Sequence, residues 1–139
     1  MNKILIDSDV ILDFFFDRLP FSESASEILM LCEGKEITGY ITPVIISNLY
    51  YLLRKNAKHD KVIDHLKKLL NILETATMNK QIVLNALNSD FNDFEDALQN
   101  FSAEFQKEIH VIVTRNTKDF KTSSLSVMTP ETYLRSIQK

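Results

Sequence analysis

Disulfide bonds, cysteine-based metal sites and flexible linkers have little basis in this sequence. Its 139 residues include one cysteine, Cys32, with two glycines and three prolines. A single cysteine excludes an intramolecular disulfide framework and any zinc site built from several cysteines, and it agrees with the reducing conditions of the cytoplasm. So little glycine and proline excludes collagen-like and low-complexity chains. We therefore expect a cytoplasmic globular protein.

Long hydrophobic runs and a large excess of either charge are also missing. No apolar run approaches the roughly 18 residues needed to span a bilayer, and the apolar stretch at residues 4–6 is too short for a signal peptide. The net charge is −3, from 16 basic and 19 acidic side chains. This balance does not favour strong non-specific binding to duplex nucleic acid. We expect no membrane partner, while a local basic patch can still bind nucleic acid.

What the chain does contain is typical of one folded domain. Apolar residues make up 45% and charged residues 25% of the sequence, which is ordinary globular usage. A chain of this length buries roughly 70% of the surface that it exposes when unfolded, so it needs no disulfide or metal to fold. Because no segment resembles a linker, residues 1–139 are expected to form a single domain.

Short apolar segments alternate with longer amphipathic ones along the chain. Strands are predicted at residues 3–6, 37–42, 109–114 and 126–128. Helices are predicted at residues 10–16, 22–33, 43–56, 60–73, 79–88 and 93–107, and a last helix is opened by Thr129-Pro130. Strands that alternate with helices favour an α/β fold, with a parallel sheet covered by helices.

Polar residues stand where two of these strands end. Asp7 ends the first strand, and Thr114, Arg115 and Asn116 end the strand at 109–114. In parallel α/β sheets, ligands bind beyond the carboxyl ends of the strands. We therefore expect these four residues to lie along one edge of the sheet.

The run Asp7-Ser8-Asp9 has two interpretations. A carboxylate directly after a buried strand can bind a hard cation or orient a water molecule. Alternatively, a polar side chain at this place caps the helix that follows. Asp7 is a candidate for the first role, whereas the capping role is expected of Asp9 or Ser8.

Acidic residues also open the helix at 93–107. Its apolar face is predicted to consist of four residues: Phe94, Leu98, Phe101 and Phe105. Asp96 points nearly opposite, on the side of Ala103 and next to Asp93. Acidic residues are favoured at the positive end of a helix, so the helix alone does not require a function for Asp96. The small Ala103 indicates that this side approaches another part of the molecule.

Three polar residues on other segments have both a functional and a structural interpretation. Asn48 lies on an apolar helix face, where its amide needs a partner or water. Asn116 and Asp119 are three residues apart and share one side of a helical turn. Either Asp119 adds a carboxylate to a site, or this segment is a turn capped by Asn116.

Taken together, Asp7, Asp96 and Asp119 make a stronger case than any one of them. Three carboxylates near strand ends and a helix start can converge on one or two Mg²⁺ or Mn²⁺ ions. Metals held in this way suit phosphodiester hydrolysis, because they lower the pKa of a water and stabilise charge on the attacking and leaving oxygens. A glycine-rich phosphate loop does not occur in the sequence, which argues against nucleotide hydrolysis.

Four stretches in order resemble a known family. They are ILIDSDVILD at residues 4–13, TPVIISNLYY at 42–51, DFEDALQ at 93–99 and IVTRNTKDF at 112–120. Each is weak alone, but their order and spacing resemble the PIN domain family, in particular its small single-domain members, which include VapC-type toxin ribonucleases. The resemblance covers essentially the whole chain.

This resemblance implies a three-layer α/β/α sandwich with a central parallel sheet. It also implies an endoribonuclease that depends on Mg²⁺ or Mn²⁺ and cleaves RNA phosphodiester bonds. Asp7 matches the first catalytic, metal-binding aspartate, Asp96 the central one, and Asp119, with Asn116 beside it, the last. The implied partners are RNA, a second copy of the chain in a homodimer and, for toxin members, an antitoxin protein.

One position departs from the family pattern. The family usually has a glutamate where Asn48 stands, and an amide keeps an oxygen ligand but loses a negative charge. Fewer charges weaken the binding of a divalent cation, and Asp93 or Asp9 would have to supply the missing one. Asn48 therefore supports an alternative function, a catalytically weakened PIN domain that binds RNA or protein.

Two further features lie outside these four stretches. The first is a basic segment with four candidate RNA-binding residues: Arg54, Lys55, Lys58 and Lys61. It is either a solvated helical face or a strip that follows an RNA backbone. The second is the run of phenylalanines at 14–16, which one short helix cannot bury on a single face. Neighbouring helices, a dimer partner or a bound peptide are expected to cover part of it.

Overall fold

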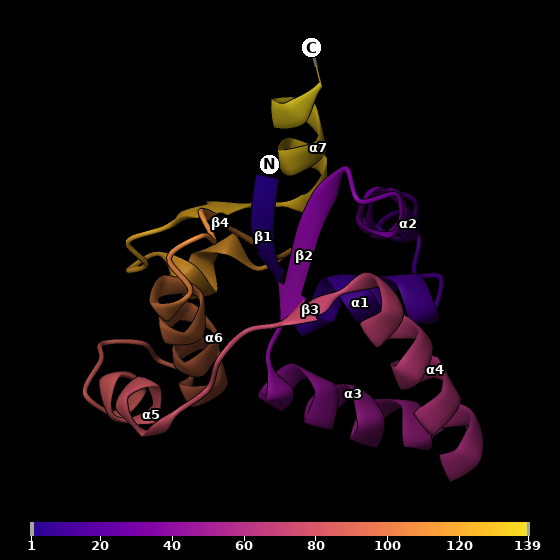
Figure 1. Ribbon diagram of the computed structural model, residues 1–139, viewed down its shortest axis with the longest axis horizontal. Coiled ribbons are helices and arrows are strands. Elements are labelled where there is room, and N and C mark those ends of the chain that lie inside the picture. Colours follow the sequence, from indigo (N-terminus) through magenta and orange to yellow (C-terminus); the bar gives the residue numbers. More distant parts are fainter. Residues whose placement is uncertain (1, 139) are drawn as a thin grey trace.

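A five-stranded parallel sheet forms the centre of the computed structural model, which describes residues 2–138 (Figure 1). Its strands are β1 (Asn2–Ile6), β2 (Ile37–Ile41), β3 (Glu74–Thr75), β4 (Val111–Val113) and β5 (Ser126–Met128). They lie in the order β3-β2-β1-β4-β5, and each neighbouring pair is parallel. The predicted parallel sheet is confirmed, although the two exposed residues of β3 were not predicted as a strand.

Helices follow the strands close to the predicted boundaries. They are α1 (Ser8–Phe15), α2 (Ser22–Glu33), α3 (Pro43–Arg54), α4 (His59–Ile72), α5 (Lys80–Leu87), α6 (Phe94–Phe105) and α7 (Pro130–Ile137), with a short 3₁₀ helix η1 (Thr117–Phe120). Within residues 2–138, no helix combines the length and the apolar character needed to cross a bilayer.

Alternate side chains of β1 point to opposite faces of the sheet and build two cores. Ile4 and Ile6 pack with residues of α1, α2, α3, α4 and α7. Leu5, one position between them, packs on the other face with Ile112, with Ala103 of α6 and with Phe120 of η1. This alternation is the two-residue period of a strand. The helices therefore form a layer on each face of the sheet, and the predicted α/β/α sandwich is confirmed (Figure 1).

The predicted apolar face of α6 is partly wrong. Phe94 and Phe105 are 47% and 51% exposed. Of that face the helix buries Leu98, together with small and polar residues: Ala97, Gln99, Asn100, Ser102 and Ala103. Ala103 touches the sheet, so the side of α6 that carries Asp96 turns inward, because small residues allow the helix to approach the strands closely. The expectation that this side approaches another part of the molecule is confirmed.

A buried hydrogen bond connects the start of α3 to α6. Thr42 caps α3, as the Thr-Pro pair predicts, by accepting a hydrogen bond from the backbone N–H of Ile45. The same hydroxyl donates to Oε1 of Gln99 at 2.5 Å. Both polar side chains are buried, and a buried polar group needs such a partner. The contact fixes α3 against α6 beside the carboxyl edge of the sheet.

Candidate active site

Asp7 stands at the carboxyl end of β1 and begins α1. Its Oδ1 accepts a hydrogen bond from the backbone N–H of Ser8 at 2.8 Å, and its Oδ2 accepts one from Oγ1 of Thr114 at 2.9 Å. The side chain is 8% exposed. Asp7 is the N-cap of α1, so the prediction that Ser8 or Asp9 caps this helix is wrong. The cap falls earlier because the helix starts directly after the strand.

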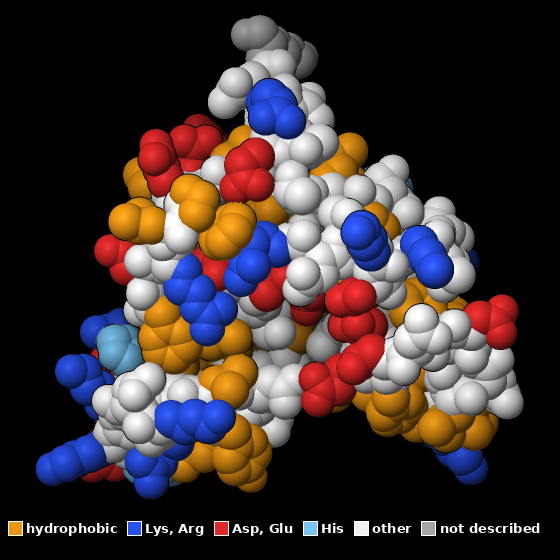
Figure 2. All heavy atoms as spheres, turned by 180° about the vertical axis from the view of Figure 1, so that it is seen from behind, with side chains coloured by type: hydrophobic (Ala, Val, Ile, Leu, Met, Phe, Trp, Pro, Cys, Tyr) orange, Lys and Arg blue, Asp and Glu red, His pale blue; other side chains and the backbone are white. Residues whose placement is uncertain are grey.

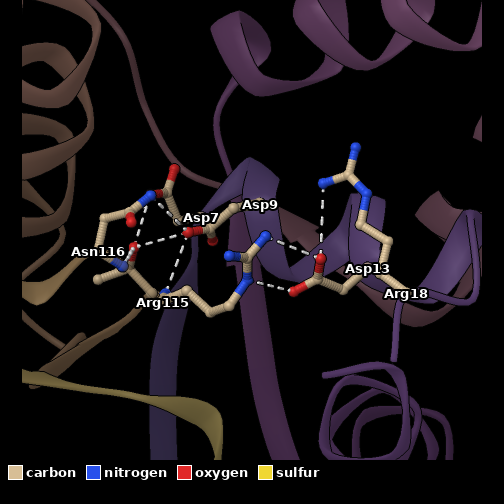
Figure 3. A network of polar contacts seen from close by, with 7 residues as sticks. Asp7, Asp9, Asp13, Arg18, Arg115 and Asn116 are labelled. Atoms are coloured by element: carbon tan, nitrogen blue, oxygen red, sulfur yellow. Dashed lines mark hydrogen bonds and ion pairs between the residues drawn. The ribbon is translucent and has the colours of Figure 1, made fainter. Parts of the chain in front are cut away.

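Asp9, in the first turn of α1, holds the segment that follows β4 (Figure 3). Its Oδ2 accepts hydrogen bonds from the backbone N–H of Arg115 and from Nδ2 of Asn116, both at 3.1 Å, and from the hydroxyl of Thr114 at 3.3 Å. Asn116 stands at the N-cap position of η1, as the structural alternative predicted, but its side chain makes no capping hydrogen bond and binds Asp9 instead. These contacts place the predicted edge residues together, as the sequence indicated.

Arg115 connects this edge to a buried carboxylate on α1. Its Nε donates to Oδ2 of Asp13 at 2.7 Å, and its Nη2 donates to Oδ1 of Asp13 at 3.0 Å (Figure 3). Asp13 is 1% exposed and also lies 3.6 Å from Arg18. The Arg115 guanidinium is stacked over the ring of Phe21, with its central carbon 4.2 Å from the ring centroid. This paired, two-pronged geometry is the strongest form of an ion pair.

We expect Asp13→Asn to lower the free energy of unfolding by about 3 kcal/mol, because it leaves a partly buried guanidinium without its counter-charge. Urea unfolding measures the change. The matched control is Asp64→Asn, which breaks an exposed pair with Lys68 and is expected to cost less than about 0.5 kcal/mol. Equal effects of the two substitutions would contradict a structural role for the Asp13 pair.

Asp96 lies in the first turn of α6, beside a hollow at the same edge of the sheet. Asp93 is the N-cap of this helix, and its Oδ1 accepts a hydrogen bond from the backbone N–H of Asp96 at 3.0 Å. The hollow has a volume of about 220 Å³, and its lining includes Asp93, Asp96, Asp119, Lys118 and Lys121. Figure 2 shows acidic side chains gathered beside a hollow between the lower lobes of the molecule.

The carboxylates at this edge disfavour one another's charge. Burial, together with the charges of Asp7, Asp93, Asp119 and Glu95, raises the pKa of Asp96 to about 7. Burial and the charge of Asp9 raise the pKa of Asp7 to about 6, although hydrogen bonds from Thr114 and Ser8 oppose the shift. The structure therefore brings Asp7, Asp96 and Asp119, which are distant in the sequence, within electrostatic reach of one another.

The donor atoms at this edge fit a hard divalent cation. They are carboxylate oxygens, which Mg²⁺ and Mn²⁺ prefer, and the buried Oδ1 of Asp9 has no hydrogen-bond partner among residues 2–138. A bound cation would offset the repulsion between the carboxylates and would give Oδ1 of Asp9 a partner. Within the same residues, no three acidic, histidine or cysteine side chains are already closed around one ion position.

Asn48 does not stand alone on α3. Its Nδ2 donates a hydrogen bond to Oε2 of Glu95, on α6, at 2.7 Å. Sequence reasoning missed Glu95, although it lies inside the DFEDALQ stretch and next to Asp96. The two residues expected to replace the missing charge have other contacts: Asp93 caps α6, and Asp9 holds the segment after β4.

The four candidate RNA-binding residues are all exposed, where α3 ends and α4 begins. Arg54 donates a hydrogen bond to the carbonyl oxygen of Ala57. None of the four lines the hollow. The cations that do line it are Lys118 and Lys121, which sequence reasoning missed because they lie in a mixed-charge turn rather than in a basic run.

These features define a three-layer α/β/α domain with an acidic site at the carboxyl edge of its sheet. The chain belongs to the PIN domain family, whose model matches residues 3–118. The resemblance found in the sequence is thus confirmed. Ribonuclease VapC1 of Aquifex aeolicus (strain VF5) is similar to it, with 28% identity over 137 residues that cover 95% of this chain and 93% of that protein.

Solved structures share the fold at lower sequence identity. A toxin–antitoxin complex from Klebsiella pneumoniae matches with a TM-score of 0.68 and 19% identity, over 91% of this chain and 97% of the other. VapBC-1 from nontypeable Haemophilus influenzae matches with a TM-score of 0.68 and 13% identity, over 93% and 98% of the two chains.

Proposed function

We propose that the chain is a divalent-metal-dependent endoribonuclease and acts in the cytoplasm as the toxin of a toxin–antitoxin pair. The observation that carries the proposal is the acidic group at the carboxyl edge of the sheet: Asp96 and Asp119 line one hollow, and the charge of Asp7 acts on Asp96 beside it. The similarity to a protein named a ribonuclease supports the activity, and the structural match to a toxin–antitoxin complex supports the biological role.

In this proposal Asp7, Asp96 and Asp119 hold Mg²⁺ or Mn²⁺. The bound ion supplies an activated water and stabilises charge on the phosphate oxygens. The chain supplies the rest of the arrangement: Thr114 and the Ser8 backbone orient the carboxylate of Asp7. Such contacts set the direction of the oxygens before an ion binds.

Cations on the surface are proposed to attract the RNA backbone. Lys118 and Lys121 line the hollow itself. Farther away, where α3 and α4 meet, the side chains of Arg54, Lys55, Lys58 and Lys61 are exposed. The exposed ring of Tyr51 lies beside Arg54 and Lys55, and aromatic rings stack on unpaired bases. We propose that a single strand runs from the hollow toward this end of α3.

The antitoxin is proposed to occupy an apolar groove away from the acidic hollow. The groove has a volume of about 670 Å³ and is lined mainly by residues of α1, α2 and α4, among them Phe14, Phe15, Leu29, Met30 and Leu69. Light scattering of the isolated chain tests this placement. A monomer leaves the groove free for a separate partner, whereas a dimer that is lost in Met30→Asp would assign the groove to the predicted homodimer instead.

Cleavage of end-labelled single-stranded RNA tests the proposed activity. We expect internal cleavage with Mn²⁺ or Mg²⁺ and none when EDTA removes the ion. Without the cation, the carboxylates of the site repel the phosphate of the RNA. DNA of the same sequence is the substrate control. RNA binding without cleavage in any of these ions would overturn the proposal and favour the binding module that Asn48 suggested.

A further inference from the structure

Two side-chain hydrogen bonds connect α3 to α6 beside the acidic site. Thr42 donates to Gln99 at the start of α3, and Asn48 donates to Glu95 farther along the same helix. From the first contact to the second, the residue number rises along α3 and falls along α6, so the two helices run antiparallel where they meet. The buried Thr42–Gln99 contact fixes the helices, and the more exposed Asn48–Glu95 contact fixes one carboxylate.

In the Asn48–Glu95 contact, the negative charge lies on Glu95 and not at position 48, where the family usually has a glutamate. An asparagine amide has two N–H donors and no charge, whereas a glutamate carboxylate only accepts hydrogen bonds. The negative charge of the pair therefore resides on α6, one residue before Asp96. Its effect reaches the site, because the charge of Glu95 contributes to the raised pKa of Asp96.

We propose that Glu95 is a fourth acidic residue of the cation site and that Asn48 is the positioning residue that holds it there. This inference rests on the proposed function, because it assumes that the site binds a divalent cation. Affinity for such a cation rises with the number of negative charges around it. The chain thus keeps the charge that a glutamate at position 48 would supply, but carries it on the opposite helix.

A simpler role for Glu95 does not account for its contact. Acidic residues at the start of a helix stabilise it through the helix dipole, and this effect needs no partner on another helix. Asp93 already caps α6 through the backbone N–H of Asp96. The hydrogen bond from Asn48 instead orders a long side chain that would otherwise keep its rotational freedom, which costs free energy.

Calorimetric titration of the whole chain with Mn²⁺ tests the inference. We expect Glu95→Gln to weaken Mn²⁺ binding about 10-fold, the usual scale for a residue that supports a metal site. The matched control is Glu104→Gln, because Glu104 lies on the same helix and accepts a hydrogen bond from Asn100 at 2.8 Å. Unlike Glu95, it is not among the charges that raise the pKa of Asp96, and its substitution should leave binding unchanged.

The double variant Asn48→Asp/Glu95→Gln exchanges the amide and the carboxylate without changing either length or net charge. We expect it to recover Mn²⁺ affinity to within about 3-fold of the wild type, since the charge returns to the pair. Thermal unfolding of each variant confirms that it is folded.

The outcomes separate the two proposals. No Mn²⁺ binding by the wild-type chain would overturn the proposed function. Binding that Glu95→Gln leaves unchanged would overturn only the role of Glu95. Weaker binding in Glu95→Gln that the exchanged pair does not restore would also overturn the inference, because it would show that the charge of the pair is not what matters.

Discussion

Replacing Asp96 by asparagine is expected to abolish Mn²⁺ binding and to lower the rate of RNA cleavage about 10³-fold. A catalytic metal contributes several kcal/mol to the stabilisation of charge, and each 1.36 kcal/mol corresponds to a factor of ten in rate. The same substitution should raise the unfolding temperature of the metal-free chain near about pH 8. Asparagine keeps the shape of Asp96 and removes a charge that burial and its acidic neighbours disfavour.

Because Asp96→Asn is expected to lower cleavage while it raises the unfolding temperature, it distinguishes a role in the site from a role in the fold more clearly than Asp7→Asn does. Both oxygens of Asp7 accept hydrogen bonds, and the residue caps α1, so Asp7→Asn would disturb the fold and the site together. Glu104→Gln is the control, because Glu104 lies on the same helix and is not among the charges that raise the pKa of Asp96; it should leave most of the cleavage. A fall in unfolding temperature with Asp96→Asn would contradict this account, and unchanged cleavage would remove Asp96 from the site.

The positions of the strands and helices follow from local sequence patterns. The strand predicted at residues 3–6 is the central strand β1, and the strand predicted at 109–114 lies beside it as β4, although β4 is shorter and covers only Val111–Val113. The Thr-Pro pairs at 42–43 and 129–130 begin α3 and α7, as their capping chemistry predicts. These features depend on residues that are near in the sequence, so short-range patterns are sufficient to locate them.

The contacts of the site depend on residues that are far apart, and local patterns did not reveal them. Asp9 accepts its hydrogen bonds from residues more than 100 positions later, so nothing near it in the sequence marks its partner. Glu95 resembles an ordinary acidic residue in the first turn of a helix until its contact with Asn48 is known. The apolar face of α6 was partly mispredicted because small residues, rather than phenylalanines, allow its close approach to the sheet.

The acidic site costs stability in the metal-free chain, and the proposed cation would offset this cost. Several carboxylates are held where burial and mutual repulsion disfavour their charged forms, an arrangement typical of functional sites. Asp13 and Arg115 form a partly buried ion pair next to the same edge and fix the backbone that carries Thr114. The neighbouring pair therefore helps to hold Thr114, whose hydroxyl donates to the carboxylate of Asp7.

Raising the pH from about 5 to about 8 is expected to destabilise the metal-free chain. The pKa values of Asp7 and Asp96 are about 6 and about 7 in the folded chain, above the ordinary value of 3.8. Between about pH 4 and about pH 7, the folded chain therefore binds more protons than the unfolded chain does. The stability that these protons contribute is complete below about pH 4 and is lost as the pH rises through about 6 to 7.

Mn²⁺ should reverse this trend, because it binds the deprotonated carboxylates and replaces the lost protons. Its affinity is expected to rise about tenfold per pH unit for each proton that binding displaces. Thermal unfolding with and without Mn²⁺ across this range measures both effects, and Asp96→Asn is the control that should flatten the metal-free trend. A metal-free chain whose unfolding temperature rises toward pH 8 would contradict the raised pKa values. Equal Mn²⁺ affinity at both ends of the range would show that the ion binds elsewhere.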